Sequence, residues 1–272
     1  MESELRTFEM TLGFIGTGTM TSALVAGLRA CGRYQDGILV SPRNAATAGE
    51  LAARYPEVAV AGSNQEVLDG ADTVILAVRP QVAESVLQQL QFGPTHHVIS
   101  IIAMFGVERL RSLVSPAASV VRAVPLPSAA QRQSPTALFP ANHAALELFG
   151  LVGSAFAVGS EEQFNALCTA TAAVASYFAF AHTVASWLAE RGVPAMEARD
   201  YVARVLPPLG EEAAHAPDLD FRSMARMHAT AGGLNEQIVN RLEEQGAFGA
   251  LRGALDGAMQ RIGSASSARG VQ

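Results

Sequence analysis

Residues 12–22 read LGFIGTGTMTS: a short apolar run, then a glycine-rich turn, then the start of a helical pattern. We expect a strand over Leu12–Ile15 and an amphipathic helix over Met20–Ala30. Gly16 allows a tight turn, and Gly18 lets backbone N–H groups approach a pyrophosphate at the helix N-terminus, where the helix dipole favours anions. The stretch therefore predicts a strand–turn–helix unit that binds a dinucleotide.

The third position of this GxGxx[G/A] pattern holds Thr21 instead of glycine or alanine. We expect the helix and the strand to pack slightly less closely at that point. A glycine-rich turn also occurs in α/β proteins that bind no nucleotide. This turn nevertheless follows the first strand of an alternating strand and helix pattern, which favours the dinucleotide site.

Short apolar runs alternate with helical patterns from residue 11 to about residue 159. The expected strands are Leu12–Ile15, Ile38–Val40, Val58–Ala61, Val74–Val78, Val98–Ile102, Val120–Val124, Thr136–Phe139 and Ala155–Val158. The expected helices between the early strands are Met20–Ala30, Ala45–Arg54 and Val82–Leu90. This alternation predicts an α/β fold, a Rossmann-type, doubly wound parallel sheet.

Beyond Ser160 the strand pattern stops, and the chain is helical in character. The expected helices are Glu161–Ala189, Pro194–Ala214, Asn235–Gln245 and Phe248–Ile262, with a bend at Pro207-Pro208. We therefore predict a NAD(P)-binding Rossmann-like domain over residues 1–159. An all-helical dimerisation and substrate domain follows over residues 160–272.

The composition excludes several classes of protein. The chain has 272 residues, 49% of them hydrophobic, and a net charge of −6, which argues against disorder and against general nucleic-acid binding. All 19 basic residues are arginine, so there is no lysine for a Schiff base or a P-loop. Cys31 and Cys168 lie far apart, as in proteins of a reducing cytoplasm, and we expect no metal site.

The N-terminal residues MESELRTFEM have no apolar core, so we expect no signal peptide and a cytoplasmic protein. The longest apolar stretch, Ala166–Leu188, contains His182 and many small polar residues. A buried helix is favoured there over a membrane-spanning one. A domain of about 110 residues cannot hide such a helix by itself, so we predict an obligate dimer formed by residues beyond Ser160.

The end of the second expected strand indicates the cofactor. A fold that prefers NAD usually places Asp or Glu about 20 residues beyond the glycines, where it binds the ribose diol. Here the residues are Ser41, Pro42, Arg43 and Asn44, with no acid. Their hydroxyl, guanidinium and amide groups suit a 2′-phosphate, which favours NADPH. The alternative is that Arg43 only faces solvent on a loop.

Several segments together resemble the pyrroline-5-carboxylate reductase family. They are GFIGTGTM at 13–20, Asn64 before VLDGADTVILAVRPQ at 67–81, SIIA at 100–103 and VRAVP at 121–125. In the helical half, the resemblance continues through Tyr177, RGV at 191–193, AGG at 231–233 and GAF at 246–248. It covers residues 11 to about 262, and the VRPQ and VRAVP segments are its more specific parts.

The resemblance implies an enzyme that reduces the C=N bond of 1-pyrroline-5-carboxylate to give proline. It also implies a homodimer or higher homo-oligomer formed by interleaved C-terminal helices, with a small-molecule imine as substrate and neither nucleic acid nor membrane as partner. The implied cofactor residues are Gly16, Thr17, Gly18, Thr19 and Met20 at the pyrophosphate, Ser41, Arg43 and Asn44 at the adenine-side phosphate, Asn64 at the ribose, and Ala77, Val78, Arg79 and Pro80 toward the nicotinamide. Arg79 stands where the family usually has lysine.

The departures from the family lie around the substrate. The family's Ser-Pro-Gly-Gly-Thr-Thr loop, whose amides and hydroxyls bind the substrate carboxylate, reads Thr-Ala-Gly-Gly-Leu-Asn at 230–235. Gly232 and Gly233 could retain the amide cradle, but Leu234 and Asn235 replace both threonines. The family's Asn-Thr-Pro likewise becomes Leu-Pro-Ser at 126–128. These changes suggest a more apolar or amide-bearing substrate, or a lost activity.

Imine reduction needs a hydride donor, an electrophilic carbon and exclusion of water, and no acid–base pair is mandatory. The candidate catalytic residues are Tyr177, Thr230 and Asn235, with Gly232, Gly233 and Leu234 at the substrate. Among other polar candidates, His182 suits a packed helix, His228 precedes the glycine loop, and Glu236, like Asn235, suits a helix cap. Three functions stay open: this imine reductase, a reductase of another imine or oxo compound, and an inactive NADP-binding sensor or scaffold.

Overall fold

The structure is a computed structural model that describes residues 11–267. The N-terminal segment MESELRTFEM, for which we expect no signal peptide, lies outside the described residues. The chain divides into two compact units. One comprises the residues up to Cys168 together with those from Gln260 onward, and the other comprises Thr169–Met259. Our proposed domain boundary, between residues 159 and 160, lies just before the first long helix of the C-terminal half. The division between the two units falls nine residues later.

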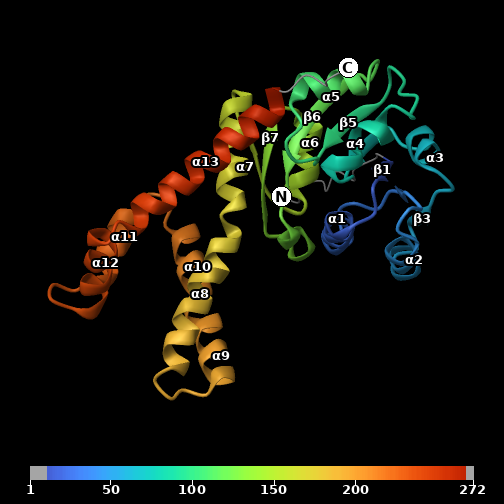
Figure 1. The fold of residues 1–272 in the computed structure, drawn as a ribbon. Helices are drawn as coiled ribbons and strands as arrows, with labels where there is room; N and C mark the ends of the chain where they lie inside the picture. The colour runs from blue at the N-terminus through green and yellow to red at the C-terminus, as the bar shows by residue number, and fades with distance from the viewer. Residues whose placement is uncertain (1–10, 268–272) are drawn as a thin grey trace, which may run out of the picture. The chain divides into compact units, whose positions relative to one another are not determined.

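The first unit contains an eight-stranded sheet in the order β3-β2-β1-β4-β5-β6-β7-β8 (Figure 1). The strands are β1 (Leu12–Ile15), β2 (Ile38–Val40), β3 (Val58–Val60), β4 (Thr73–Leu76), β5 (His97–Ser100), β6 (Ser119–Val124), β7 (Ser134–Phe139) and β8 (Gly153–Ala157). The helices are α1 (Thr19–Ala30), α2 (Ala45–Arg54), α3 (Asn64–Asp69), α4 (Pro80–Leu87), α5 (Val107–Leu113), the 3₁₀ helix η1 (Pro127–Gln131) and α6 (His143–Gly150). Each predicted strand is confirmed to within two residues at either end.

The direction of the last two strands differs from the all-parallel prediction. Strands β1 to β6 are mutually parallel, whereas β7 is antiparallel to β6 and parallel to β8. The connection from β6 to β7 holds only residues 125–133, including η1. A crossover between parallel strands needs about a dozen residues or more, so this short connection returns the chain in the opposite direction. The sheet is therefore mostly parallel.

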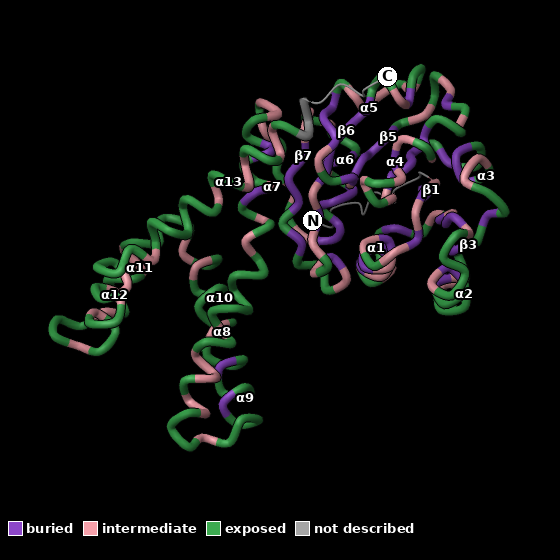
Figure 2. The backbone as a smooth tube through the Cα atoms, viewed as in Figure 1, coloured by how far each residue is buried: buried purple, intermediate pink, exposed green. Residues whose placement is uncertain are grey.

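Helices cover both faces of the sheet, as a parallel sheet requires. One apolar cluster joins β1 through Leu12 and Phe14 to α1, α2, η1 and α6. The other contains Ile15 from the opposite face of β1 and residues of α3, α4 and α5. The central strands β1, β4, β5 and β6 are accordingly buried along most of their length, whereas the edge strands β3 and β8 are mostly exposed or half-buried (Figure 2). The alternating side chains of β1 thus place the glycine turn at the end of a strand that is packed on both sides.

The sequence did not predict five short elements: α3, α5, η1, α6 and α11 (Phe221–His228). Each has between five and eight residues. A helix of about two turns contains too few apolar residues to show a helical period in the sequence. Packing against the rest of the fold stabilises such short segments.

The C-terminal half consists of helices: α7 (Glu161–Ala172), α8 (Val174–Ala189), α9 (Ala195–Val205), α10 (Pro207–His215), α11, α12 (Leu234–Glu244) and α13 (Ala247–Ser267). The single helix predicted over Glu161–Ala189 is divided at Ala173 into α7 and α8. The predicted interruption at Pro207-Pro208 is confirmed, because α9 ends at Val205 and α10 begins at Pro207. Proline cannot donate the backbone hydrogen bond that would continue α9.

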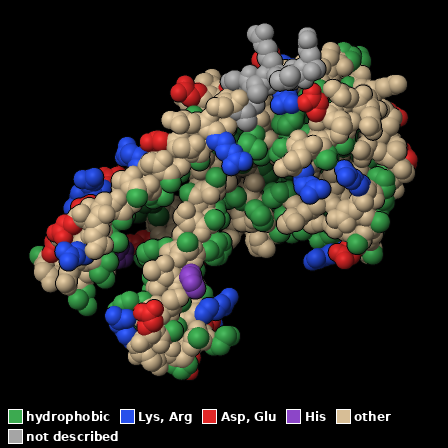
Figure 3. Space-filling model, in the orientation of Figure 1, with side chains coloured by type: hydrophobic (Ala, Val, Ile, Leu, Met, Phe, Trp, Pro, Cys, Tyr) green, Lys and Arg blue, Asp and Glu red, His purple; other side chains and the backbone are tan. Residues whose placement is uncertain are grey.

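The second unit has almost no apolar core of its own. Among its apolar side chains, only Ala198 and Val202 are buried. Helix α8 has no buried residue, and Phe178 is 65% exposed, so the expected burial of this segment is not met within one chain. Hydrophobic side chains reach the surface along the α8 and α9 segments (Figure 3). The polar and apolar sides of these helices therefore both face solvent in the single chain.

By length and composition alone, residues 161–189 form a segment that could cross a membrane, with 17% of its most apolar window buried. One segment of this kind is weak evidence for a membrane span, because core helices of soluble proteins have the same composition. The polar residues Thr169, Thr171, Ser176, His182 and Ser186 recur along it. This pattern favours a helix that packs against protein.

Candidate functional site

The turn after β1 requires glycine at its first position. Gly16 has a φ of +105°, a backbone conformation that side chains with a Cβ rarely adopt. A Cβ atom there would lie 2.6 Å from the backbone carbon and oxygen of Ala77. The close approach of these two backbone segments, one after β1 and one after β4, therefore depends on the absence of a side chain.

Hydrogen bonds of Ser41 and Thr17 stabilise this turn. The N–H of Gly16 donates to Oγ of Ser41 at 2.8 Å, and the hydroxyl of Thr17 donates to the Ser41 carbonyl at 2.6 Å. The two hydroxyls also lie 3.1 Å apart, and both residues are buried. The resemblance implied that Ser41 contacts a phosphate. That contact stays a prediction; Ser41 is 0% exposed, and its hydroxyl joins the end of β2 to the glycine turn.

Thr21 ties the helix to the same turn. The side chain is fully buried, and its hydroxyl donates to the carbonyl of Gly16 at 2.6 Å. The third fingerprint position thus contributes a hydrogen bond that glycine or alanine cannot make. This contact leaves the loop between β1 and α1 supported by side chains on two sides, from Ser41 and from Thr21.

The N-terminus of α1 is open at Gly18. This residue caps the helix without a side-chain hydrogen bond, and a Cβ built on it would meet nothing within 4 Å. Thr19, the first helical residue, is exposed, and Met20 is half-buried. The first N–H groups of a helix have no partner within it, and the helix dipole adds partial positive charge. The arrangement suits a pyrophosphate.

The loop after β4 lies directly beside the glycine turn. The N–H of Ala77 donates to the carbonyl of Ile15 at 2.8 Å, which continues the pairing of β1 with β4 beyond the strands. Val78 and Pro80 are half-buried, while Arg79 is exposed and caps α4. Because β2 lies on one side of β1 and β4 on the other, the two loops border the crevice where the strand order reverses. Open α/β sheets bind their ligands at this point.

The polar residues after β2 lie on the other side of that crevice. Arg43 and Asn44 are both exposed, and the amide of Asn44 donates to the hydroxyl of Thr47 at 2.8 Å. No acidic residue lies in this segment. Asn64, the predicted ribose contact, is the half-buried first residue of α3. The first unit therefore gathers the predicted cofactor residues along one edge of the sheet.

A buried ion pair supports the neighbouring part of this edge. Nη1 of Arg122, on β6, lies 2.6 Å from Oε1 of Glu161, the first residue of α7, and Arg122 is 2% exposed. Burial lowers the pKa of Arg122, and the Glu161 carboxylate opposes that shift. Burial also raises the pKa of the nearby Cys168 thiol to about 11. Sequence analysis assigned no role to Arg122 or Glu161, and the VRAVP segment was the only signal that pointed to the arginine.

In the second unit, the predicted amide cradle already has acceptors. The N–H of Gly232 donates to Oε2 of Glu236 at 2.7 Å, and the N–H of Gly233 donates to the carbonyl of Thr230 at 2.8 Å. Helix α12 begins at Leu234, which is 77% exposed, with Gly233 as its N-cap. The loop is thus closed by its own backbone and by a carboxylate. A carboxylate ligand at these amides would have to replace Glu236.

The remaining predicted residues of this unit lie in two groups. The amide of Asn235 donates to the carbonyl of His228 at 2.8 Å. His228 also lies 3.1 Å from a Glu212 carboxylate oxygen. His228, Glu212 and Tyr177 line a cavity of about 550 Å³. Thr230 and Asn235 are not among the residues that line it, so the structure does not bring the three predicted catalytic residues into one cavity.

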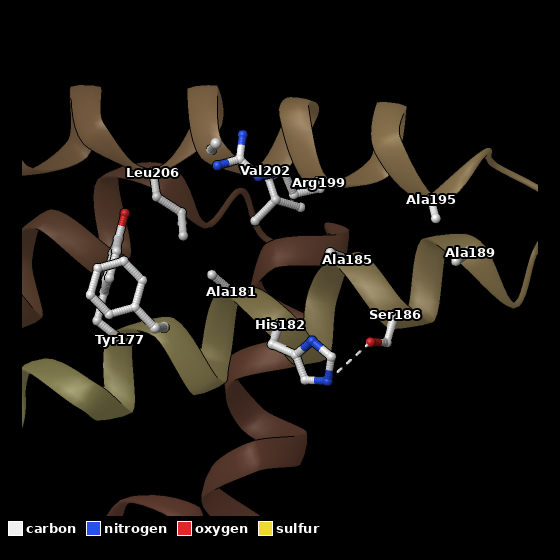
Figure 4. A pocket seen from close by; sticks show the side chains of 12 residues that line it. Tyr177, Ala181, His182, Ala185, Ser186, Ala189, Ala195, Arg199, Val202 and Leu206 are labelled. Carbon is white, nitrogen blue, oxygen red and sulfur yellow. Dashed lines mark hydrogen bonds between the residues drawn. The ribbon is translucent and has the colours of Figure 1, made fainter.

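Tyr177 also borders a groove between α8 and α9. This groove has a volume of about 520 Å³, and Figure 4 shows Val202 and Leu206 pointing toward the alanines of α8. On the near side, His182 faces Ser186, with 3.5 Å between Nε2 and Oγ. Both His182 and Tyr177 are exposed, in contrast to the packed positions that their apolar helix suggested. Within residues 11–267, no group of three or more His, Cys, Asp or Glu side chains is arranged to hold a metal ion.

Comparison with known proteins agrees with this architecture. The family model described as "NADP oxidoreductase coenzyme F420-dependent" matches residues 11–104. Pyrroline-5-carboxylate reductase of Pseudomonas aeruginosa is 30% identical over 61% of this chain and 64% of its own length. Pyrroline-5-carboxylate reductase 3 of Danio rerio is 27% identical over 93% of this chain and 91% of its own length. The chain is thus similar to pyrroline-5-carboxylate reductases over most of its length.

A solved structure shares the whole fold. The pyrroline carboxylate reductase of Plasmodium falciparum, with NADP bound, superposes with a TM-score of 0.80 at 17% identity, covering 95% of this chain and 99% of that one. The mostly parallel sheet followed by helices is therefore a fold that this chain shares with that reductase. The alignment with the Pseudomonas aeruginosa protein spans just under two thirds of that relative's length.

Proposed function

We propose that the protein is an NADPH-dependent oxidoreductase that reduces the C=N bond of a cyclic imine, as pyrroline-5-carboxylate reductases do. The observation that carries this proposal is the open N-terminus of α1 at Gly18, beside the crevice between β1 and β4. Similarity to pyrroline-5-carboxylate reductases and the bound NADP of the Plasmodium falciparum protein support it. NADPH supplies the hydride when it is bound.

The cofactor preference rests on the residues after β2. Arg43 and Asn44 are exposed on the side of the crevice where the adenosine half of a dinucleotide lies, and no carboxylate competes for a 2′-phosphate there. Ser41 is buried behind the turn, so we assign it to positioning Gly16 rather than to the phosphate. The residues proposed to contact the cofactor are Gly16, Thr17, Gly18, Thr19, Met20, Arg43, Asn44, Asn64, Ala77, Val78, Arg79 and Pro80.

The substrate is proposed to be a cyclic imine without a carboxylate on the ring carbon next to the imine nitrogen. The loop 230–235 is the proposed substrate loop, with Tyr177 as a further contact, but the N–H of Gly232 is donated to Glu236. A substrate carboxylate would meet this negative charge and would lose both threonine hydroxyls of the family loop. If each hydroxyl contributes about 1.5 kcal/mol to a charged ligand, their loss reduces efficiency on 1-pyrroline-5-carboxylate on the order of a hundredfold.

We further propose that the protein is a cytoplasmic homodimer whose second copy covers α8. This helix is apolar in composition but has no buried residue in the single chain. In the single chain, Phe178, Phe180 and Trp187 together expose an apolar patch to water, and such patches usually mark a protein interface. A second copy of the chain supplies an identical apolar face, which is the usual arrangement in symmetric dimers.

The decisive experiment is to follow NADPH oxidation with a panel of cyclic imines that includes 1-pyrroline-5-carboxylate and 1-pyrroline. We expect turnover of 1-pyrroline and weak or no turnover of its 5-carboxylate. Calorimetric titration with NADPH then separates the two alternatives. Tight binding without turnover of any imine or oxo compound would support a sensor or scaffold, and absence of binding would contradict the proposal altogether.

A further inference from the structure

We propose that Glu161 is a positioning residue that fixes the loop between β5 and α5, residues 101–106, and through it the nicotinamide half of the cofactor site. The inference rests on the proposed NADPH-binding function. Glu161 is the first residue of α7 and follows the last strand, so it is distant in sequence from every predicted cofactor residue.

A single carboxylate oxygen joins the residue after this loop to a side chain of β6, the strand that pairs with the residue before the loop. Oε1 of Glu161 accepts from the N–H of Val107 at 2.7 Å and from Nη1 of Arg122 at 2.6 Å. Val107 is the first residue of α5, directly after the loop. Arg122 pairs in the sheet with Ser100, the last residue of β5 and the residue directly before the loop. The carboxylate therefore constrains the distance between the loop's two ends.

The surroundings make this contact hard to replace. The Arg122 side chain is 3% exposed, its guanidinium lies 4.4 Å from the centre of the Phe164 ring, and Nη1 also donates to Asn165 at 3.0 Å. Because the Arg122 side chain is buried, a loss of the Glu161 carboxylate leaves its cation without the partner that compensates its charge. Removing the carboxylate therefore releases both Arg122 and the N–H of Val107.

The backbone of loop 101–106 includes a residue in a conformation that its surroundings must stabilise. Met104 has a φ of +63°, and the only other described non-glycine residue with a positive φ is Arg132. Left-handed backbone at such residues persists where the surrounding structure determines it, and it is frequent at binding sites. The loop follows β5, which pairs with β4 on the side of β1 opposite to β2. In this type of fold, the nicotinamide half of a bound dinucleotide extends over these strands.

Glu161→Ala tests the proposal, with Glu162→Gln as the matched control because Glu162 is the exposed neighbour in the same helical turn. The ligands are NADPH and adenosine 2′,5′-bisphosphate, which occupies only the adenosine half. We expect Glu161→Ala to weaken NADPH about tenfold, as misplacement of a binding loop does, with the fragment unchanged within about twofold. Glu162→Gln should change neither affinity.

Hydrogen exchange provides a readout that does not depend on any ligand. Residues 101–107 should exchange faster in Glu161→Ala than in the parent, while β1 and α1 keep their protection. Equal weakening of NADPH and the fragment, or unchanged exchange at 101–107, would overturn the proposal. If Glu161→Ala does not fold, Glu161→Gln gives the same test, because it loses the charge that holds Arg122. A parent protein that binds neither ligand would contradict the proposed function, and the exchange result would still decide the role of Glu161.

Discussion

The backbone N–H of Gly16 donates to the hydroxyl of Ser41 across 2.8 Å, which joins the turn after the first strand to the end of the second. The same hydroxyl lies 3.1 Å from that of Thr17. Ser41 thus supports the glycine turn, and Arg43 and Asn44 are left as the exposed polar groups of its segment. The buried residue of this segment therefore supports the turn, and the exposed residues are the ones proposed to recognise a phosphate.

The two glycines of the turn should respond differently to an added methyl group. Gly18→Ala meets no atom within 4 Å, so the free energy of unfolding should change by less than about 1 kcal/mol. Its methyl group would nevertheless occupy the space in front of α1 where we propose that the pyrophosphate binds, so NADPH affinity should fall strongly. Gly16→Ala meets the backbone of Ala77 at 2.6 Å and should lower stability by about 1–3 kcal/mol.

Denaturant unfolding and NADPH titration of both variants check this expectation. A Gly18→Ala protein that binds NADPH as well as the parent would show that the pyrophosphate does not lie at the α1 N-terminus.

Replacing Arg43 should separate the two nicotinamide cofactors. Arg43→Ala removes a cation from the proposed 2′-phosphate contact, so NADPH should bind more weakly by about 1.5–3 kcal/mol, while NADH affinity changes little. Arg33→Ala is the control, because it removes the same charge just beyond the C-terminal end of α1, away from the crevice. Calorimetric titration of the parent and both variants with NADPH and with NADH measures all six affinities. Equal affinities of the parent protein for NADPH and NADH would contradict the assignment.

Removing the Glu236 carboxylate should open the substrate loop to carboxylates. Glu236→Gln frees the loop of a negative charge beside Gly232, and we expect efficiency on 1-pyrroline-5-carboxylate to rise about tenfold, or about 1.4 kcal/mol. Efficiency on 1-pyrroline should not rise. Glu243→Gln, at an exposed position of the same helix, is the charge-matched control. Steady-state kinetics with both imines provide the measurement.

The double variant Leu234→Thr and Asn235→Thr tests the same loop by restoring the two threonine hydroxyls of the family pattern. It should raise activity on 1-pyrroline-5-carboxylate further when combined with Glu236→Gln. Robust activity of the parent on this compound, with no gain in any variant, would show that the loop does not select the substrate.

Assembly should depend on the apolar face of α8. Light scattering of the parent should give a dimer at micromolar concentration. Phe178→Glu places a charge at a side chain that is 65% exposed in the single chain and should shift the protein to monomers. Val60→Glu, on the edge strand β3, is the control and should leave the dimer intact. A parent protein that is a stable monomer would refute the proposed dimer.

The half-buried thiol of Cys168 gives a prediction for alkaline pH. Burial raises its pKa to about 11 from the ordinary 9.0, although Arg122 opposes the shift, so the folded protein keeps the thiol protonated where the unfolded chain ionises it. Its contribution to stability is present below about pH 9 and is lost as the pH rises toward 11. At pH 8, two units of pKa correspond to about a hundredfold less thiolate.

Alkylation by iodoacetamide, followed by mass spectrometry, measures this difference. Cys168 in the native protein should react about a hundredfold more slowly than in the denatured chain. Comparable rates in the two states at pH 8 would exclude the buried environment described for this residue.

The local elements of the fold were accessible from the sequence alone. Short apolar runs such as Leu12–Ile15 and Ile38–Val40, the glycine turn and the long helical patterns beyond Ser160 each depend on neighbouring residues. Their period, glycines and prolines therefore specify them without reference to the rest of the chain. The same reasoning located the crevice edge, because the C-terminal ends of parallel strands lie together.

Only the tertiary structure decided which groups meet across long separations. Residues 122 and 161 form an ion pair 39 positions apart, Ser41 turns away from solvent toward Gly16, and Glu236 occupies the N–H of Gly232. The reversal of β7 and β8 likewise follows from how the chain returns to the sheet. A residue type specifies what a side chain can bind, but its partner depends on which backbones packing brings within hydrogen-bond distance. Apolar burial drives that packing over the whole unit, and no local pattern of residues records the result.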